Sequence, residues 1–352
     1  MSSKFSHGIT CFLFLVTIFA IKAKADDHHQ DQSDHSYHID LDVKKFGAKG
    51  DGKIDDTAAF SNAWQEACRS KKESVLTIAK GTFIVGKLEF MGPCEQSVEI
   101  EVEGTVQSSD TKSVTGGAHP NAWITFQNIK NLSIYGEGTF DSKGIDKDCP
   151  STTSGNKCTG KPMNLLFFRV TNAEIGDITS TNGDYVHIGI FESTNVLVED
   201  VNIYEMATAL PLATITPISM SKKMHCEAGN GLGIGPLGTD QFEKSVKCVT
   251  VKNCSFGHTE GGIRIEIYHG SQKPLDISNL VFEDIIMDYT QNTPIILNQE
   301  LCITPEGKGR CEKTVPSNVK KSNVSFKNVK GTTVQPTVPL SNFRAGRGHA
   351  MM

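Results

Sequence analysis

The middle of the chain carries acidic side chains that could exchange a proton with a bound substrate. These residues are Asp184, Glu192, Glu205 and Glu227. Further along, Arg264 can hold a ligand carboxylate through two parallel hydrogen bonds, whereas Glu266 brings the opposite charge two residues later. Between these stretches, Asn230 lies between two glycines and offers an amide that does not titrate. The residues predict acid–base chemistry on an anionic ligand only if the carboxyl groups meet in the folded chain.

The composition limits the classes of protein and partner. The 352 residues are 38% hydrophobic and 21% charged, as in a folded soluble protein, and the net charge is -5. This balance argues against a nucleic-acid partner, which would need a basic face. A polyanionic ligand stays compatible, because a local basic cleft can lie on an acidic protein. We expect a monomer with no cofactor.

Short strand-like segments recur along the chain after residue 42. In each, β-branched and aliphatic residues alternate with polar ones until a Gly, Asn or Asp; examples are residues 131–140, 195–203, 249–256, 279–286 and 323–329. Strands at intervals of a few tens of residues predict a stacked solenoid, in which neighbouring coils bury a continuous core. The Asn residues suit side-chain hydrogen bonding between adjacent coils. A β-sandwich is the alternative, but short Asn-Gly hairpin turns do not join the strands.

One segment, residues 57–68, has the periodicity of an amphipathic helix and begins after two aspartates. Its apolar side chains are Ala59, Phe60, Ala63, Trp64 and Ala67. A solenoid needs its open end covered, so we expect this helix to be the N-terminal cap.

Two segments break the strand pattern. Residues 206–224 show neither alternation nor turn chemistry, and their two prolines disfavour a central strand of a sheet. The tail, residues 339–352, carries no strand that could cap the far end of the solenoid. We therefore expect one β-helix domain at residues 43–338, followed by an atypical tail.

Residues 1–25 are typical of a secretory signal peptide. Lys4 and His7 precede an apolar run at residues 11–21, and Ala23-Lys24-Ala25 is a small-x-small cleavage site. An uncleaved anchor is the alternative, but the apolar run is short for a membrane span. We expect a secreted, extracellular or cell-wall protein that has no membrane association after cleavage.

The next segment, residues 26–42, is acidic and rich in histidine, as in a solvated leader. If cleavage follows Ala25, His28 becomes the third residue of the mature chain. A free amine, two backbone amides and this imidazole could then bind Cu(II) in a square plane. We prefer the solvated leader, keep His28 as the alternative, and expect no metal elsewhere.

Export also bears on the cysteines and the sequons. Removing Cys11 with the signal peptide leaves nine of the 10 cysteines, so at least one thiol is unpaired in an oxidising compartment. Two close pairs, which bracket loops, are candidate disulfides: Cys149 with Cys158, and Cys302 with Cys311. Three sequons are candidate glycosylation sites: Asn131, Asn253 and Asn323.

Several segments, taken in order, resemble the plant polygalacturonases and other pectin-active β-helices. They include residues 43–56 (VKKFGAKGDGKIDD), 86–94 (GKLEFMGPC), 136–141 (GEGTFD), 226–238 (CEAGNGLGIGPLG), 261–267 (GGIRIEI) and 324–331 (VSFKNVKG). The ordered set is specific although each piece is short, and it is most similar to the exo-acting plant type. The resemblance implies a right-handed parallel β-helix that hydrolyses α-1,4-galacturonosyl bonds of pectin with inversion and without a cofactor.

Inversion needs one protonated carboxyl group and carboxylates that activate water on the opposite face, roughly 6.5–9.5 Å away. The family supplies these groups with Asn-Thr-Asp, an Asp-Asp pair one coil later, Gly-His-Gly and Arg-Ile-Lys. In this chain Asn230 occupies the His place, so proton transfer there is lost. Glu266 occupies the Lys place beside Arg264, and two like charges at ~4 Å cost on the order of 1–4 kcal/mol. A galacturonate would be repelled where the family binds it.

The Asp-Asp pair has no counterpart, because an ungapped count back from Cys226 places it at Ala207 and Thr208. The resemblance further implies that Cys226 has lost its disulfide partner. Cys226 and Cys248 are therefore the two candidates for the unpaired thiol.

Asp184 follows Asn182-Gly183 and so looks like the Asp of Asn-Thr-Asp. However, residues 177–203 match the family's preceding coil without gaps, including His187. The catalytic coil would then begin near Met206, and about one coil is absent. We prefer this interpretation, in which Asp184 is a solvated turn residue; the alternative keeps it as the catalytic Asp.

Three functions are compatible with the sequence. The first is a polygalacturonase-family protein with little or no hydrolase activity that keeps contact with pectin through Arg264 and the groove. Losing one general acid or base costs ~10²–10⁴ in rate, and losing several together abolishes their shared function. The second is an active polygalacturonase that uses other carboxylates. The third is a defective product that folds poorly, because solenoid stability sums over coils and caps.

Overall fold

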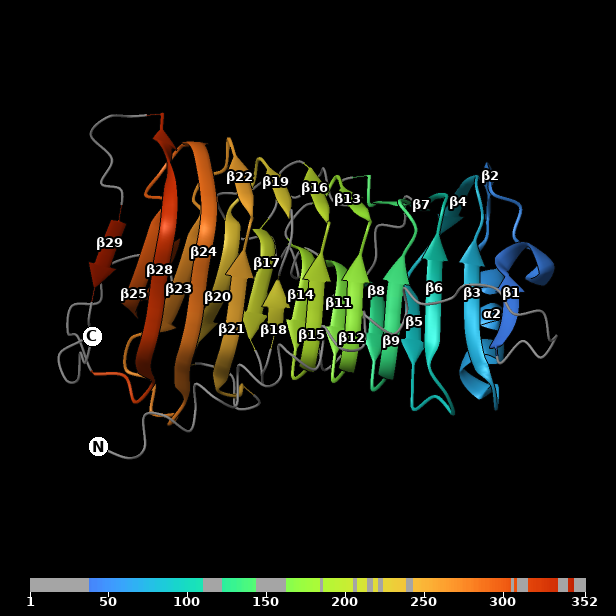
Figure 1. Cartoon of the computed structure of the whole chain (residues 1–352), viewed down its shortest axis with the longest axis horizontal. Helices are drawn as coiled ribbons and strands as arrows, with labels where there is room; N and C mark the ends of the chain where they lie inside the picture. The colour runs from blue at the N-terminus through green and yellow to red at the C-terminus, as the bar shows by residue number, and fades with distance from the viewer. Residues whose placement is uncertain are drawn as a thin grey trace, which may run out of the picture.

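A computed structural model gives the fold of the chain. It describes residues 38–109, 122–143, 163–183, 186–204, 208–213, 218–220, 224–238, 243–304, 307–308, 316–334 and 341–344. Figure 1 shows an elongated solenoid in which the strands stack side by side along the long axis. The N-terminal strands and a helix lie at one end, and the C-terminal strands at the other.

The described strands form two long parallel sheets, and the larger has 18 strands. They are β1 (His38–Asp42), β2 (Asp51–Asp55), β3 (Glu73–Ile78), β4 (Thr82–Val85), β6 (Val98–Val102), β7 (Thr105–Ser108), β9 (Lys130–Tyr135), β10 (Thr139–Asp141), β12 (Thr171–Gly176), β13 (Thr179–Thr181), β15 (Thr194–Glu199), β16 (Asn202–Tyr204), β18 (Ile218–Met220), β19 (His225–Glu227), β21 (Val246–Lys252), β22 (Ser255–Gly257), β24 (Asp276–Thr290) and β28 (Lys320–Thr333).

The second sheet has nine described strands. They are β5 (Leu88–Met91), β8 (Ala122–Gln127), β11 (Met163–Phe168), β14 (Val186–Phe191), β17 (Thr208–Ala213), β20 (Gly231–Leu237), β23 (Ile263–Tyr268), β25 (Ile295–Leu301) and β29 (Ser341–Arg344). A short antiparallel pair, β26 (Ile303–Thr304) and β27 (Gly307–Lys308), lies apart from both sheets.

Each coil contributes strands to both sheets and pairs in parallel with the coils before and after it. In the nine-stranded sheet, for example, β11 pairs with β8 and β14. Alternation explains the core: β3 buries Leu76 and Ile78 completely or nearly so, while its intervening residues are half-buried. The predicted all-β, right-handed parallel β-helix is confirmed.

The predicted hydrogen bonding between Asn residues of adjacent coils is also confirmed. Asn172 donates to Asn131 Oδ1 (3.0 Å) and accepts from Asn195 Nδ2 (2.9 Å), and Asn323 donates to Asn279 Oδ1 (3.0 Å). All five have φ between 53° and 58°, a left-handed conformation that asparagine tolerates. We call these contacts the Asn ladder.

The predicted capping helix is α2 (Thr57–Arg69), which follows the 3₁₀ turn η1 (Val43–Phe46). The five predicted apolar residues of α2 are buried. The helix packs on η1, β1, β3 and β5 at the N-terminal end of the solenoid, as Figure 1 shows. The Trp64 indole donates to the Met91 carbonyl (3.2 Å), which fixes the cap on β5.

Two segments differ from their sequence-based expectations. Residues 206–224, which we call the altered segment, supply β17. This central strand contains Pro211 and pairs with both β14 and β20. A register shift in β17, between Thr208 and Leu210, accommodates this strand beside β20. The tail, expected to carry no strand, supplies β29, which pairs with β25. In addition, the last five residues of the expected leader form β1, which pairs with β3.

At the C-terminal end, β28 is the last described strand of the 18-stranded sheet and pairs only with β24. Its residues alternate between exposed and half-buried, so this coil covers the core incompletely. Four lysines lie on it: Lys320, Lys321, Lys327 and Lys330.

The cysteines only partly follow the expectation. A disulfide joins Cys68 of α2 to Cys94, a pair that the sequence interpretation did not single out. Cys226 is free and buried as expected, and Cys254 is a second free, buried cysteine. Cys248 is disulfide-bonded, so it is not the unpaired thiol. Burial raises the pKa of the Cys254 thiol to about 12, which keeps it protonated.

Several predictions concern residues beyond those that the structure describes. These are the signal peptide at residues 1–25, His28, and the cysteines Cys149, Cys158 and Cys311. Cys302 is disulfide-bonded, which is compatible with its expected pairing. None of the described helices is long and apolar enough to cross a membrane.

Candidate functional site

The positions that the resemblance assigns to catalysis lie on three neighbouring strands of the nine-stranded sheet. Thr208 at the start of β17 pairs in register with Gly231 of β20, next to Asn230. Gly233 of β20 pairs in turn with Arg264 of β23. The fold therefore places these positions on or next to adjacent strands, although Ala207 lies outside the described residues. Thr208, Asn230 and Glu266 supply neither a carboxyl pair nor an imidazole.

Arg264 and Glu266 lie two residues apart on β23 and therefore on the same face. Both are half-buried. Arg264 Nε is buried without a hydrogen-bond partner, and neither side chain forms an ion pair within the described part of the chain. An anionic ligand at Arg264 would therefore have Glu266, a carboxylate of its own charge, on the same face of the strand.

Strand β20, which lies between β17 and β23, offers no reactive side chain. Leu232 and Ile234 of β20 are buried in the core, and the alternating positions are Gly231, Gly233 and Gly235. The face that continues from Arg264 across β20 is therefore bare backbone. Binding by this face depends on Arg264 and on the turns that flank the strands.

The other acidic candidates do not assemble with Arg264 in the described structure. Asp184 and Glu205 lie outside the described residues. Glu192 is held by Arg169 (Nε to Oε2, 2.9 Å), with its side chain 14% exposed. The neighbouring His187 is fully buried, with Nδ1 2.9 Å from Ser180 Oγ, so it has a structural place in the core.

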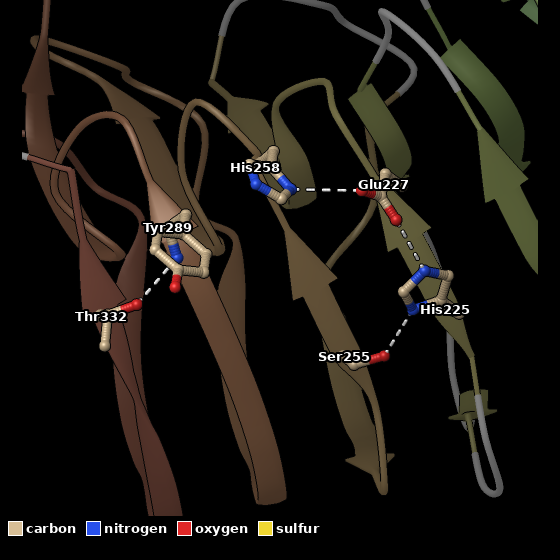
Figure 2. Close-up of polar contacts among 6 residues, drawn as sticks. All are labelled: His225, Glu227, Ser255, His258, Tyr289 and Thr332. Carbon is tan, nitrogen blue, oxygen red and sulfur yellow. Dashed lines mark hydrogen bonds and ion pairs between the residues drawn. The ribbon is translucent and has the colours of Figure 1, made fainter.

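Glu227 belongs to a separate cluster on the 18-stranded sheet, shown in Figure 2. Its Oε2 lies 3.1 Å from His225 Nε2, and its Oε1 lies 3.2 Å from His258 Nδ1. The other ring nitrogen of His225, Nδ1, lies 2.8 Å from Ser255 Oγ. The hydrogen bond with His225, followed by that with His258, holds the pKa of the Glu227 carboxyl below its usual value. Glu227 is therefore ionised and not suited to act as a general acid.

Two tyrosines extend this cluster on either side. The Tyr204 ring meets His225 edge-on, with centroids 6.0 Å apart, and His258 stacks on Tyr289, with centroids 5.2 Å apart and planes 8° apart. We call the five side chains Tyr204, His225, Glu227, His258 and Tyr289 the ring row. Sequence analysis singled out only Glu227, because no periodic pattern connects residues on four different coils.

No group of three His, Cys, Asp or Glu in the described part of the chain has a geometry that would hold a metal ion. The His225–Glu227–His258 contacts are hydrogen bonds between the side chains themselves. The geometry of both regions is thus compatible with carbohydrate contact through charged, polar and aromatic side chains.

The chain is similar to polygalacturonases over most of its length. The family model of glycosyl hydrolases family 28 matches residues 68–217 and 214–344. An exopolygalacturonase from Arabidopsis thaliana is 36% identical over 326 residues, covering 83% of this chain and 70% of that protein. A polygalacturonase from Gossypium barbadense is 35% identical over 322 residues, covering 84% and 77%.

Solved structures share the fold at lower identity. The endo-xylogalacturonan hydrolase from Aspergillus tubingensis superposes with a TM-score of 0.60 at 18% identity, over 88% of this chain and 89% of that one. An exopolygalacturonase from Thermotoga maritima gives 0.56 at 14% identity, over 89% and 84%. These structures show the fold, and the family model together with the relatives at 35–36% identity establishes that the chain belongs to glycosyl hydrolases family 28.

Proposed function

We propose that this protein is a secreted, pectin-binding member of the family with little or no hydrolase activity. The observation that carries the proposal is the composition of the site. The strands β17, β20 and β23 are in register, yet Thr208, Asn230 and Glu266 occupy positions where hydrolysis requires Asp, His and Lys. Inverting hydrolysis needs a proton donor and a base on opposite sides of the bond, and these positions supply a single carboxyl group, Glu266, with no second one to act with it.

Two features of the sequence matches, a family match in two pieces and gaps in an alignment, support the proposed loss of a coil. The family model matches in two pieces that meet at residues 214–217, inside the altered segment. The alignment with the Arabidopsis relative runs over 326 residues but covers only 83% of the 352-residue chain, so that relative has residues inside the matched span that this chain lacks. This favours the interpretation that the catalytic coil is absent and that Asp184 is a turn residue of the preceding coil.

Binding to galacturonate would rest on Arg264. Arg264 is half-buried, and its guanidinium can form a charge-assisted hydrogen bond with a sugar carboxylate. Glu266 on the same face weakens that contact by repulsion, so we expect weak, salt-sensitive binding. Pectin is the proposed partner, and the contact needs no cofactor.

The test measures hydrolysis and binding on the purified secreted chain. Reducing ends released from polygalacturonate at about pH 5 are compared with those released by the Arabidopsis exopolygalacturonase. We expect no release, and weak binding that Arg264→Gln abolishes and Arg169→Gln, a matched change at the Glu192 pair, leaves intact. Release within tenfold of the control would contradict the proposal.

The same assay separates the two alternatives. An active enzyme with other carboxylates would lose its release of reducing ends in Asp184→Asn, or in the corresponding changes at Glu192, Glu205 and Glu227. A defective product would show no single cooperative unfolding transition. The close register of β17 with both neighbouring strands favours a folded chain.

A further inference from the structure

The ring row forms a continuous surface across four successive coils. Tyr204 pairs in register with Glu227, Glu227 with Gly257, and Gly257 with Asp288, which precedes Tyr289. Each coil adds about 4.8 Å along the solenoid axis. The row therefore runs along that axis, and Figure 2 shows His225, Glu227, His258 and Tyr289 following one another over it.

The rings of the row face solvent although their contacts fix them in place. Tyr204 is 39% exposed and Tyr289 56% exposed, and the His258 side chain is 63% exposed. The stacked pairs inside the solenoid, such as Phe126 on Phe167, are fully buried by comparison. Exposed aromatic rings that lie together mark an interaction surface more often than isolated apolar residues do.

The side chains of the row are also held before any ligand arrives. Glu227 fixes both imidazoles through hydrogen bonds, His258 stacks on Tyr289, and the Tyr289 backbone N–H donates to Thr332 Oγ1 (3.0 Å). Gly257 lies between Glu227 and Asp288 in register, and the Glu227 carboxylate lies over it, where it reaches both imidazoles. Preorganised side chains lose little conformational entropy on binding.

The chemistry of the row selects a class of ligand. The exposed parts of the Tyr204 and Tyr289 rings can contact the C–H face of a pyranose ring, while the two tyrosine hydroxyls, His258 Nε2 and the Glu227 carboxylate can bind its hydroxyl groups. The coil spacing is close to the length of one sugar in an extended 1,4-linked chain, so successive sugars can meet successive coils. Glu227 and the exposed Asp288 would repel a polyanion.

We propose that the ring row is a second carbohydrate-binding surface, separate from Arg264, for an uncharged 1,4-linked hexopyranose chain. It lies on the 18-stranded sheet, whereas Arg264 lies on β23 of the nine-stranded sheet. The proposal rests on family membership and the geometry of the row, and not on the proposed loss of hydrolysis.

The test is binding of the secreted chain to an array of neutral 1,4-linked hexose oligosaccharides, with oligogalacturonate on the same array. We expect binding to at least one neutral hexamer, weakened about tenfold by Tyr289→Ala and by His258→Ala. Tyr289→Phe should keep most of it. Tyr135→Ala is the matched control, because Tyr135 lies on β9 of the same sheet and bonds Glu99 (3.0 Å) outside the row.

The outcomes distinguish this surface from the site around Arg264. Neutral binding that survives Arg264→Gln but is lost in Tyr289→Ala supports the row. Absence of binding to every neutral chain overturns the proposal, as does binding that Tyr289→Ala and His258→Ala leave unchanged. Thermal unfolding of each variant shows whether lost binding reflects lost folding. Tyr289→Phe keeps the aromatic ring that stacks on His258, so its binding separates the role of the ring from that of the hydroxyl group.

Discussion

Two consecutive coils of this solenoid differ sharply in chemistry but not in strand pairing. The coil of β14, β15 and β16 carries the buried His187 and continues the Asn ladder with Asn195. The coil of β17, β18 and β19 pairs with it in parallel along both sheets. Within the described residues this ladder ends at Asn195, whose Oδ1 is buried without a hydrogen-bond partner.

The comparison shows which properties a coil needs in order to pair with the adjacent coils. Strand register and an apolar inner side suffice, because each coil contacts only the coils beside it. Ladder amides and catalytic side chains point elsewhere and can be replaced without breaking that register. The proposed loss of hydrolysis therefore leaves the strand pairing of the β-helix intact, and the following predictions test how far fold and chemistry are separable.

The largest expected loss of stability comes from a change in the core of the coils that precede β17. Phe167 of β11 is fully buried and stacks on Phe126 at 4.9 Å, so Phe167→Ala should lower the free energy of unfolding by about 3–5 kcal/mol. Leu232→Ala, in the fully buried position of β20 after the altered coil, should cost about 2–5 kcal/mol. Urea unfolding followed by circular dichroism measures both. A cost below about 1 kcal/mol for Leu232→Ala would show that the core loosens after the altered coil.

The cap depends on the Cys68–Cys94 disulfide, which closes a loop between residues 26 apart. Replacing both cysteines by alanine should destabilise the chain by about 2–4 kcal/mol. Cys254→Ala, at a buried thiol outside any disulfide, is the control for lost side-chain volume. Equal losses in the two variants would mean that the cross-link adds nothing to the cap.

Binding of oligogalacturonate at Arg264 should become tighter when one neighbouring charge is changed. Glu266→Lys removes a repulsion and restores a cation beside Arg264, so affinity for oligogalacturonate at low salt should rise about tenfold. Glu266→Gln should give part of that gain. Calorimetric titration at two salt concentrations measures both, and hydrolysis should stay absent. An unchanged affinity would place the bound sugar away from β23.

The Asn ladder should give a smaller effect that depends on position. Asn172 bonds two neighbours, whereas Asn195 bonds one, so Asn172→Ala should cost about 1–2 kcal/mol and Asn195→Ala about half of that. Thermal unfolding of the two variants and of Asn323→Ala, at the end of the second ladder, compares them directly. Equal costs at all three positions would argue against additive ladder bonds.

The smallest expected effect concerns acid stability of the last coils. Lys252 and then Lys327 hold the pKa of Glu283 at about 2, below its usual 4.5. A lowered pKa stabilises the folded state above pH 4.5, and this contribution disappears as the pH falls towards 2. The melting temperature of Glu283→Gln should therefore lie below that of the parent chain at pH 6, and the two should converge near pH 2.

Asp276→Asn, at the exposed ion pair with Lys247, is the control for losses of stability at low pH that do not involve Glu283. If the gap between Glu283→Gln and the parent chain stays constant from pH 6 to pH 2, the bridge of Glu283 to its two lysines does not contribute.

The sequence predicted the parts of the fold that depend on repetition. Alternating apolar residues gave the stacked coils, the spacing of Ala59 to Ala67 gave α2, and the turn asparagines gave the ladder. It was wrong about Pro211 and about the tail, because both strands are specified by pairing with a neighbour and not by their own residues.

The candidate site was only partly predictable. Arg264, Asn230 and Glu266 were found by resemblance to a motif, and the structure places their strands side by side. The ring row was not predicted because its members on successive coils are 21 to 33 residues apart in the sequence and meet only through strand register. The Cys68–Cys94 disulfide was missed for a similar reason, since it joins the cap helix to the segment after β5.

The last strand of the larger sheet has a consequence for how the molecule behaves at high concentration. An open coil is a template onto which another copy could add its own strands, and repeated addition would build a fibre. The four lysines of β28 oppose this, because an added strand would bring further charge against theirs and bury it. Among the described strands none pairs with the outer edge of β28, and its lysines protect that edge against self-association, so neutralising Lys320, Lys321, Lys327 and Lys330 would favour end-to-end association.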